Sequence, residues 1–262
     1  DGTKVLFTDE WGGGGRPRCR ASDPVTWGAN AIYDIVDNEL QFRSHFKLPA
    51  PQTEFENCVA HNGSLVPVPG RDVFVQAWYQ GGISVMDFTD SSNPIEIAFF
   101  DRGPLDDEDL IFGGYWSAYW FGGLIYGTEI TRGLDVLTLT PSVYLTENEI
   151  AAASLGRSDL VFNPQQQRPH VWPADPVVAL AYVDQLERTE VVAAAEASAL
   201  TDVLQRVKSL VDSGVSRDLN VAADLVALSR LVEVKTRRSS ETTRNRVAGL
   251  AETMEALAAQ FR

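Results

Sequence analysis

The sequence predicts a β-propeller fold, with about three blades of short antiparallel strands, followed by a small α-helical bundle. Two observations predict the β part. A strand–turn–strand pattern recurs at a spacing of roughly 40 to 50 residues, and within each copy apolar and polar residues alternate as in half-buried strands. A third observation, a shift of composition to Ala, Leu, Val and Glu after Pro141, predicts the helical part. The expected domains are residues 1–145 for the blades, 146–173 for a short helix and linker, and 174–262 for the bundle.

The middle copy of the repeat shows the pattern most clearly. Strands are expected at residues 73–79, 83–90 and 95–100, with the Gly-Gly turn at residues 81–82 between the first two. The third copy has strands at residues 124–129 and 134–139.

The first copy has strands at residues 5–10, 29–37 and 40–46. Asp1-Gly2 is typical of a hairpin turn, and no strand precedes it in this sequence. Because a propeller closes with about four to eight blades, we expect further blades N-terminal to Asp1.

Helix-start signals appear beyond the repeats. Thr146 and Glu149 form a capping-box pattern ahead of a short helix, and Asp175 followed by Pro176 is typical of an N-cap and first turn. Ser239 or Ser240 is expected to cap the last helix. Apolar residues then recur at helical spacing in three stretches, namely 200–211, 221–232 and 247–261. These stripes predict an antiparallel bundle, with a coiled-coil seam to a partner as the alternative.

Composition narrows the class of function. The chain of 262 residues has 36 acidic and 22 basic side chains, a formal charge of −14, and this balance argues against nucleic acid as a partner. No stretch reaches the roughly 20 apolar residues that span a bilayer, so no transmembrane segment is predicted.

Cys19 and Cys58 are the two cysteines of the chain, and neither has another ligand at zinc-site spacing. We expect a disulfide between neighbouring blades, typical of an exported protein, with two unrelated thiols as the alternative.

A set of motifs follows Cys58. His61-Asn62-Gly63 is followed by Trp78-Tyr79-Gln80-Gly81-Gly82, the return Ile83-Ser84-Val85-Met86-Asp87, then Tyr115-Trp116-Ser117-Ala118-Tyr119-Trp120, and later Arg132-Gly133-Leu134-Asp135-Val136. Over roughly residues 1–150 this pattern resembles the LVIVD-repeat propellers of exported bacterial proteins.

The resemblance implies a seven-bladed type of propeller, secreted or attached to the cell surface of a bacterium, without an agreed activity. The sequence departs from the motif that names the family, since it has Ile-Ser-Val-Met-Asp at 83–87 and Leu-Asp-Val-Leu-Thr at 134–138. The blade number is therefore open.

The ends of the inner strands of a propeller line one mouth of its channel, and alignment of the repeats places Glu10 and Glu129 there. We expect Glu10, His61, Trp116 and Glu129 to converge at this mouth. A carboxylate and an imidazole suit a divalent metal, so His61 and Glu129 are the metal-ligand candidates. The alternative is that His61 and Glu129 only form hydrogen bonds with the backbone of the blades.

Three functions are compatible with these features. The first is an extracellular or cell-surface scaffold that binds a protein or a glycan. The second is a metal-dependent enzyme or metal binder at the channel mouth. The third is recognition by the helical bundle, with the basic run 235–238 docking onto an acidic partner.

Overall fold

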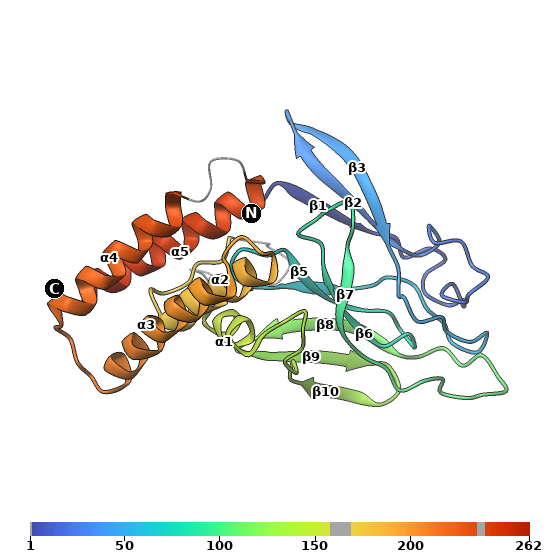
Figure 1. Cartoon of the computed structure of the whole chain (residues 1–262). Helices are drawn as coiled ribbons and strands as arrows, with labels where there is room; N and C mark the ends of the chain where they lie inside the picture. The colour runs from blue at the N-terminus through green and yellow to red at the C-terminus, as the bar shows by residue number, and fades with distance from the viewer. Residues whose placement is uncertain (1, 158–168, 235–238) are drawn as a thin grey trace. The chain divides into compact units, whose positions relative to one another are not determined.

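The chain folds into two compact units (Figure 1). The computed structural model describes residues 2–157, 169–234 and 239–262. The described residues of the first unit are 2–66, 71–140 and 169, and those of the second are 67–70, 141–157, 170–234 and 239–262. Asp1, most of the predicted linker and the basic run 235–238 lie outside the described residues.

The first unit is made of strands. Its described residues form three antiparallel sheets, in which strands adjacent in sequence are adjacent in space. The first sheet contains β1 (Lys4–Thr8), β2 (Asn30–Val36) and β3 (Glu39–Phe46). The second contains β4 (Gly63–Val66), β5 (Val73–Ala77), β6 (Ile83–Asp87) and β7 (Ile95–Phe100). The third contains β8 (Tyr115–Phe121), β9 (Leu124–Glu129) and β10 (Gly133–Leu137).

The prediction of a β-propeller is wrong. The sheets have three, four and three strands, and no closed ring of sheets is found in the part of the chain that the structure describes. The repeat pattern predicts hairpins correctly, because the alternation of apolar and polar residues and the turn residues determine structure over a few positions. Closure around a channel depends on how the sheets pack against one another, and the spacing of the repeats does not specify that packing. A channel mouth is therefore not a feature of this structure.

The second sheet is the best buried of the three. All five residues of β5 are buried, and so are four of the five in β6. Ile32 and Phe46 of the first sheet pack with Phe74, Trp78 and Met86 of the second in one apolar cluster.

The third sheet also contacts the second, because β8 packs against β4 and β5. The amide of Trp120 donates to the Ser64 hydroxyl at 2.8 Å, and Asn62 forms an isolated bridge with Ser117. These contacts bring together the loops that hold the candidate site.

The second unit is helical, as the composition predicted. Its described helices are α1 (Glu147–Leu155), α2 (Pro176–Arg188), α3 (Ala194–Asp212), α4 (Leu219–Glu233) and α5 (Glu241–Gln260). Helix α2 packs against α1, α3 and α5, and α4 packs against α5. Leu180, Leu204, Leu225, Leu250 and Met254 are fully enclosed in the resulting core.

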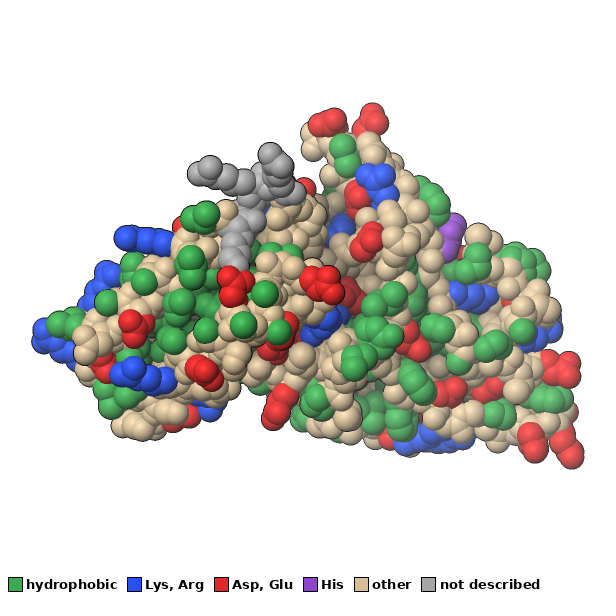
Figure 2. Space-filling view, viewed as in Figure 1, with side chains coloured by type: hydrophobic (Ala, Val, Ile, Leu, Met, Phe, Trp, Pro, Cys, Tyr) green, Lys and Arg blue, Asp and Glu red, His purple; other side chains and the backbone are tan. Residues whose placement is uncertain are grey.

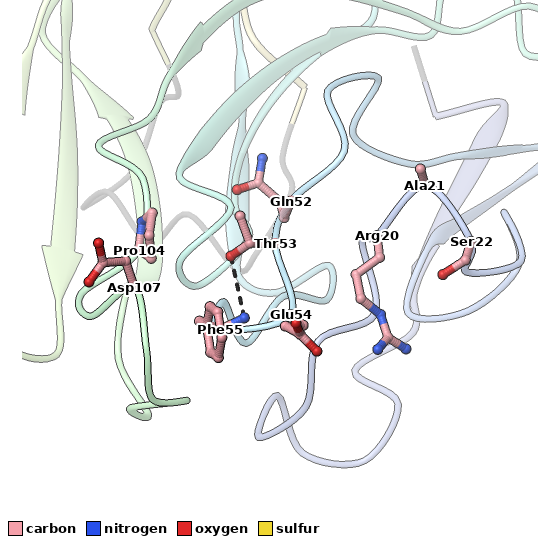
Figure 3. A pocket seen from close by; sticks show the side chains of 9 residues that line it. All are labelled: Arg20, Ala21, Ser22, Gln52, Thr53, Glu54, Phe55, Pro104 and Asp107. Carbon is pink, nitrogen blue, oxygen red and sulfur yellow. Dashed lines mark hydrogen bonds between the residues drawn. The ribbon is translucent and has the colours of Figure 1, made fainter.

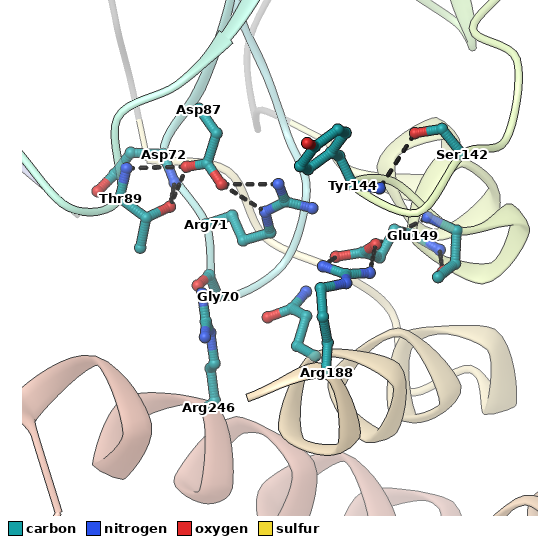
Figure 4. Close-up of polar contacts among 12 residues, drawn as sticks. Gly70, Arg71, Asp72, Asp87, Thr89, Ser142, Tyr144, Glu149, Arg188 and Arg246 are labelled. Atoms are coloured by element: carbon teal, nitrogen blue, oxygen red, sulfur yellow. Dashed lines mark hydrogen bonds and ion pairs between the residues drawn. The ribbon is translucent and has the colours of Figure 1, made fainter. Parts of the chain in front are cut away.

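The predicted helix starts are confirmed. Thr146 and Glu149 form a capping box at α1, Asp175 caps α2 and Ser240 caps α5. Glu149 is fully buried and also pairs with Arg188 of α2, with 2.5 Å between Oε2 and Nη2 (Figure 4). The N-cap of α1 is thereby tied to a second helix.

Segment 67–70 belongs to the helical unit through its backbone carbonyls. Trp172 donates to the carbonyl of Pro67 at 3.0 Å, Gln185 to that of Pro69 at 2.8 Å, and Arg246 to that of Gly70 at 3.2 Å. Among the described residues, no helix is both long enough and apolar enough to cross a membrane.

Candidate functional site

The long loop between β1 and β2 is held in place by a disulfide bond. Cys19 and Cys58 are joined, with their Cα atoms 5.7 Å apart, as the sequence predicted. Pro17 forms a parallel bridge with Cys58, and the Cys58 amide donates to the carbonyl of Arg16 at 3.1 Å. The loop is thus fixed beside the segment that leads to His61.

Three polar side chains meet where this loop contacts the second sheet. His61 is buried, and its Nε2 atom lies 3.3 Å from Oε1 of Glu10. The same oxygen accepts a hydrogen bond of 2.7 Å from the Tyr79 hydroxyl. The Glu10 side chain is 41% exposed, so the buried side chains of His61 and Tyr79 are connected to solvent through its carboxylate.

The hydrogen-bond partner of Nδ1 determines the tautomer of the His61 ring. Nδ1 contacts the backbone carbonyl oxygen of Trp116, and a carbonyl only accepts, so Nδ1 carries a hydrogen. Nε2 is then the ring nitrogen that faces Glu10.

Tyr79 has an unusual backbone conformation. Its φ angle is +51°, in the left-handed region that non-glycine residues seldom adopt. Two backbone hydrogen bonds with Tyr115, of 3.1 and 2.8 Å, hold it there. Burial, with smaller contributions from the bond to Glu10 and the charge of that carboxylate, raises the pKa of the Tyr79 phenol well above its ordinary value. The phenol therefore stays protonated and donates to Glu10. The positive φ angle of Tyr79 is a local backbone strain of the kind found at functional sites.

Aromatic rings surround this polar group. The Trp116 ring lies 4.6 Å from the His61 ring and 5.9 Å from Tyr79, and Phe112 lies 5.8 Å from Tyr79. Trp116 is 46% exposed and Phe112 47% exposed, so the rings are available to a ligand. We call Glu10, Trp11, His61, Tyr79, Phe112 and Trp116 together the aromatic site.

Trp11 extends the aromatic site along the loop. It is 40% exposed and packs edge to face on Trp27, with ring centroids 4.6 Å apart. The guanidinium of Arg18 lies over both rings, 4.6 Å from Trp11 and 5.0 Å from Trp27. Such cation–π contacts contribute about 0.5–1 kcal/mol each at exposed positions.

The predicted convergence of four residues is only partly present. Glu10, His61 and Trp116 come together, whereas Glu129 is buried and bonds its own turn. Its carboxylate accepts from the amides of Gly114 at 2.8 Å and Thr131 at 2.9 Å, and from the amide of Arg132. Glu129 is thus not available as a metal ligand. In residues 2–157, 169–234 and 239–262, no group of three or more His, Cys, Asp or Glu side chains could hold a metal ion.

Sequence reasoning missed the buried amides that support the site. Asn30 and Gln76 bond reciprocally at 2.6 and 3.1 Å, and Gln76 also donates to the His61 carbonyl at 2.8 Å. Gln80 donates to Asn57 at 2.7 Å, and Asn57 donates to the carbonyl of Gly14 at 2.8 Å. A lone Asn or Gln in a strand gives no signal of such a role, because its partner lies far away in the sequence.

An open depression of about 680 Å³ also lies in the first unit (Figure 3). It is lined by Arg20, Ala21, Ser22, Gln52, Thr53, Glu54, Phe55, Pro104 and Asp107. Arg20, its cationic side chain, is already paired with Asp23 through two hydrogen bonds, and Thr53 bonds the amide of Phe55. The depression therefore offers fewer free groups than the aromatic site.

Comparison with known proteins gave no relative: no family model, curated protein or solved structure matches this chain.

Proposed function

We propose that this chain is a binding module of an extracellular or cell-surface protein, and that the aromatic site binds a glycan. The observation that carries the proposal is the exposed ring of Trp116, which packs on His61 beside the polar pair Glu10 and His61. Two more exposed rings lie next to this pair, Phe112 in contact with Tyr79 and Trp11 adjacent to Glu10 in the chain. Sugar rings present apolar C–H faces that stack on indole rings, and hydroxyl groups that need donors and acceptors. The site provides both.

The preformed geometry supports binding. Tyr79 and the buried amides fix His61 and Glu10 before any ligand arrives, and fixed groups lose little entropy on binding. A metal-dependent reaction has less support, because Glu129 is committed to backbone donors and the site retains one carboxylate and one imidazole.

The Cys19–Cys58 disulfide supports an exported location, because disulfides form and persist in oxidising compartments.

The experiment is a screen of the purified chain on an array of neutral and acidic oligosaccharides, followed by calorimetric titration of the best binder. Trp116→Ala is expected to weaken binding about tenfold or more, the size of effect seen for central aromatic residues in interfaces. Phe99→Ala is the matched control, because Phe99 is 72% exposed on β7 and lies outside the aromatic site. Absence of any binder on the array, or equal binding by Trp116→Ala and wild type, would overturn the proposal.

A further inference from the structure

Arg18 stands out among the arginines of the chain. Of the described arginines that are at least partly shielded from solvent, Arg20 pairs with Asp23, Arg71 with Asp87, and Arg246 donates to a backbone carbonyl. Figure 4 shows the Arg71–Asp87 pair. Arg18 is partly shielded too, yet no described residue accepts a hydrogen bond from it.

This absence is notable in so acidic a chain. The sequence has 36 acidic side chains, and Figure 2 shows them spread over the visible face of the molecule. In place of a carboxylate, Arg18 has the rings of Trp11 and Trp27 against its guanidinium. Stacking on rings orients a guanidinium but leaves the N–H groups at its edge unbonded.

The atoms of Arg18 differ in their access to solvent. Nε is enclosed and has no acceptor among the described residues, whereas the residue as a whole is only partly buried. We therefore infer that a ligand would meet the two terminal amino groups. They carry a planar array of N–H bonds that matches the two oxygens of a carboxylate.

A second cation, Lys47, lies near Arg18. Lys47 donates to the carbonyl of Pro24 at 3.0 Å. Burial is the main cause that holds the pKa of Lys47 below its ordinary value, and the nearby charge of Arg18 adds to it while Asp23 opposes it. Asp23 is itself paired with Arg20, so it does not neutralise Arg18.

We propose that Arg18 binds the carboxylate of an acidic, uronic-acid-containing oligosaccharide, with Trp11 and Trp27 orienting the guanidinium. This inference rests on the proposed function, and it names the class of glycan that the aromatic site takes. Trp11 links the two parts, because it directly follows Glu10 in the chain and its exposed ring stacks on Arg18. One sugar ring can thus pack on an indole while its carboxylate meets Arg18.

The test uses two probes that differ only in charge, a galacturonic acid hexamer and its fully methyl-esterified form. Calorimetric titration of the wild-type chain is expected to show about tenfold weaker binding of the ester, and a loss of affinity for the acid as salt increases. Arg18→Gln is expected to reduce affinity for the acid about tenfold and to leave the ester unchanged. The affinity of Arg18→Lys for the acid is expected to lie between those of the wild type and Arg18→Gln, because lysine keeps the charge and lacks the planar donor array.

Arg16→Gln is the matched control, since it makes the same charge change at an exposed position two residues away. Equal losses in Arg16→Gln and Arg18→Gln would indicate general electrostatics and overturn the proposal, as would equal binding of acid and ester by the wild type. The wild-type comparison keeps the test valid if a variant does not fold. Binding of neutral glycans alone overturns only the role of Arg18, whereas binding of no glycan at all overturns the proposed function as well. Preference for a sulfated hexamer over the galacturonic acid hexamer would overturn the carboxylate assignment.

Discussion

Removal of the Cys19–Cys58 disulfide is expected to destabilise the first unit strongly. The two cysteines are 39 positions apart, and the chain-entropy relation for a closed loop of that length gives about 13 cal/mol/K, or about 4 kcal/mol at 25 °C. We expect a loss of about 2–4 kcal/mol in Cys19→Ser/Cys58→Ser, since such relations tend to overestimate the effect. With a urea slope of about 2 kcal/mol/M, the unfolding midpoint falls by about 1–2 M.

The assay is urea unfolding followed by tryptophan fluorescence. Five of the six tryptophans lie in the first unit, so the signal reports mainly on that unit. Reduction of the wild-type chain should reproduce the shift, and the same reductant should leave the double variant unchanged. Because the disulfide fixes the loop that holds Trp11 and Arg18, glycan binding should weaken in parallel. Equal midpoints for the oxidised wild type and the double variant would refute this reasoning.

Three further predictions concern single positions. Gly14→Ala should destabilise the first unit more than Gly12→Ala, because a Cβ at Gly14 would lie 2.2 Å from Cζ of Tyr79 whereas one at Gly12 meets nothing within 4 Å. Both glycines have a positive φ angle, so a difference between the urea midpoints of the two variants measures the effect of the clash alone. Glu129→Gln should lower the free energy of unfolding by about 1–3 kcal/mol, because buried amide donors lose a charged acceptor. The affinity for the glycan should stay unchanged, and weaker binding by a fully stable variant would place Glu129 in the site. Burial raises the pKa of Tyr182 to about 12, so the helical unit should lose stability as pH rises from about 10, where unfolded tyrosine ionises, through 12. Tyr182→Phe should lose less stability over that range in circular-dichroism melts, and an identical alkaline loss would contradict the assignment.

Much of the local structure could be predicted from the sequence. The strand expected at residues 124–129 is β9, and that expected at 95–100 is β7. The caps Thr146, Asp175 and Ser240 were also evident, since a capping side chain bonds an amide two or three positions away. Interactions between residues only a few positions apart can be predicted from the sequence alone.

The candidate site was predictable only in part. Glu10, His61 and Trp116 were expected together and do meet, but Glu129 was grouped with them because its place in the repeat resembles that of Glu10. Its partners prove to be amides of its own turn and of Gly114. The repeat position of a carboxylate specifies where its strand ends and does not specify which donors surround it.

The sequence by itself determined the hairpins, the helices and their caps, and the pair of cysteines available for a disulfide. Only the tertiary structure decided that three separate sheets replace the expected propeller and that Tyr79 completes the group around Glu10. It also decided that Arg18 stacks on two tryptophans and pairs with no carboxylate among the described residues. The physical reason is range. Hydrogen bonds and alternation within a few residues depend on local sequence, whereas sheet packing and the Tyr79–Glu10 contact, 69 positions apart, depend on how the whole chain buries its apolar surface.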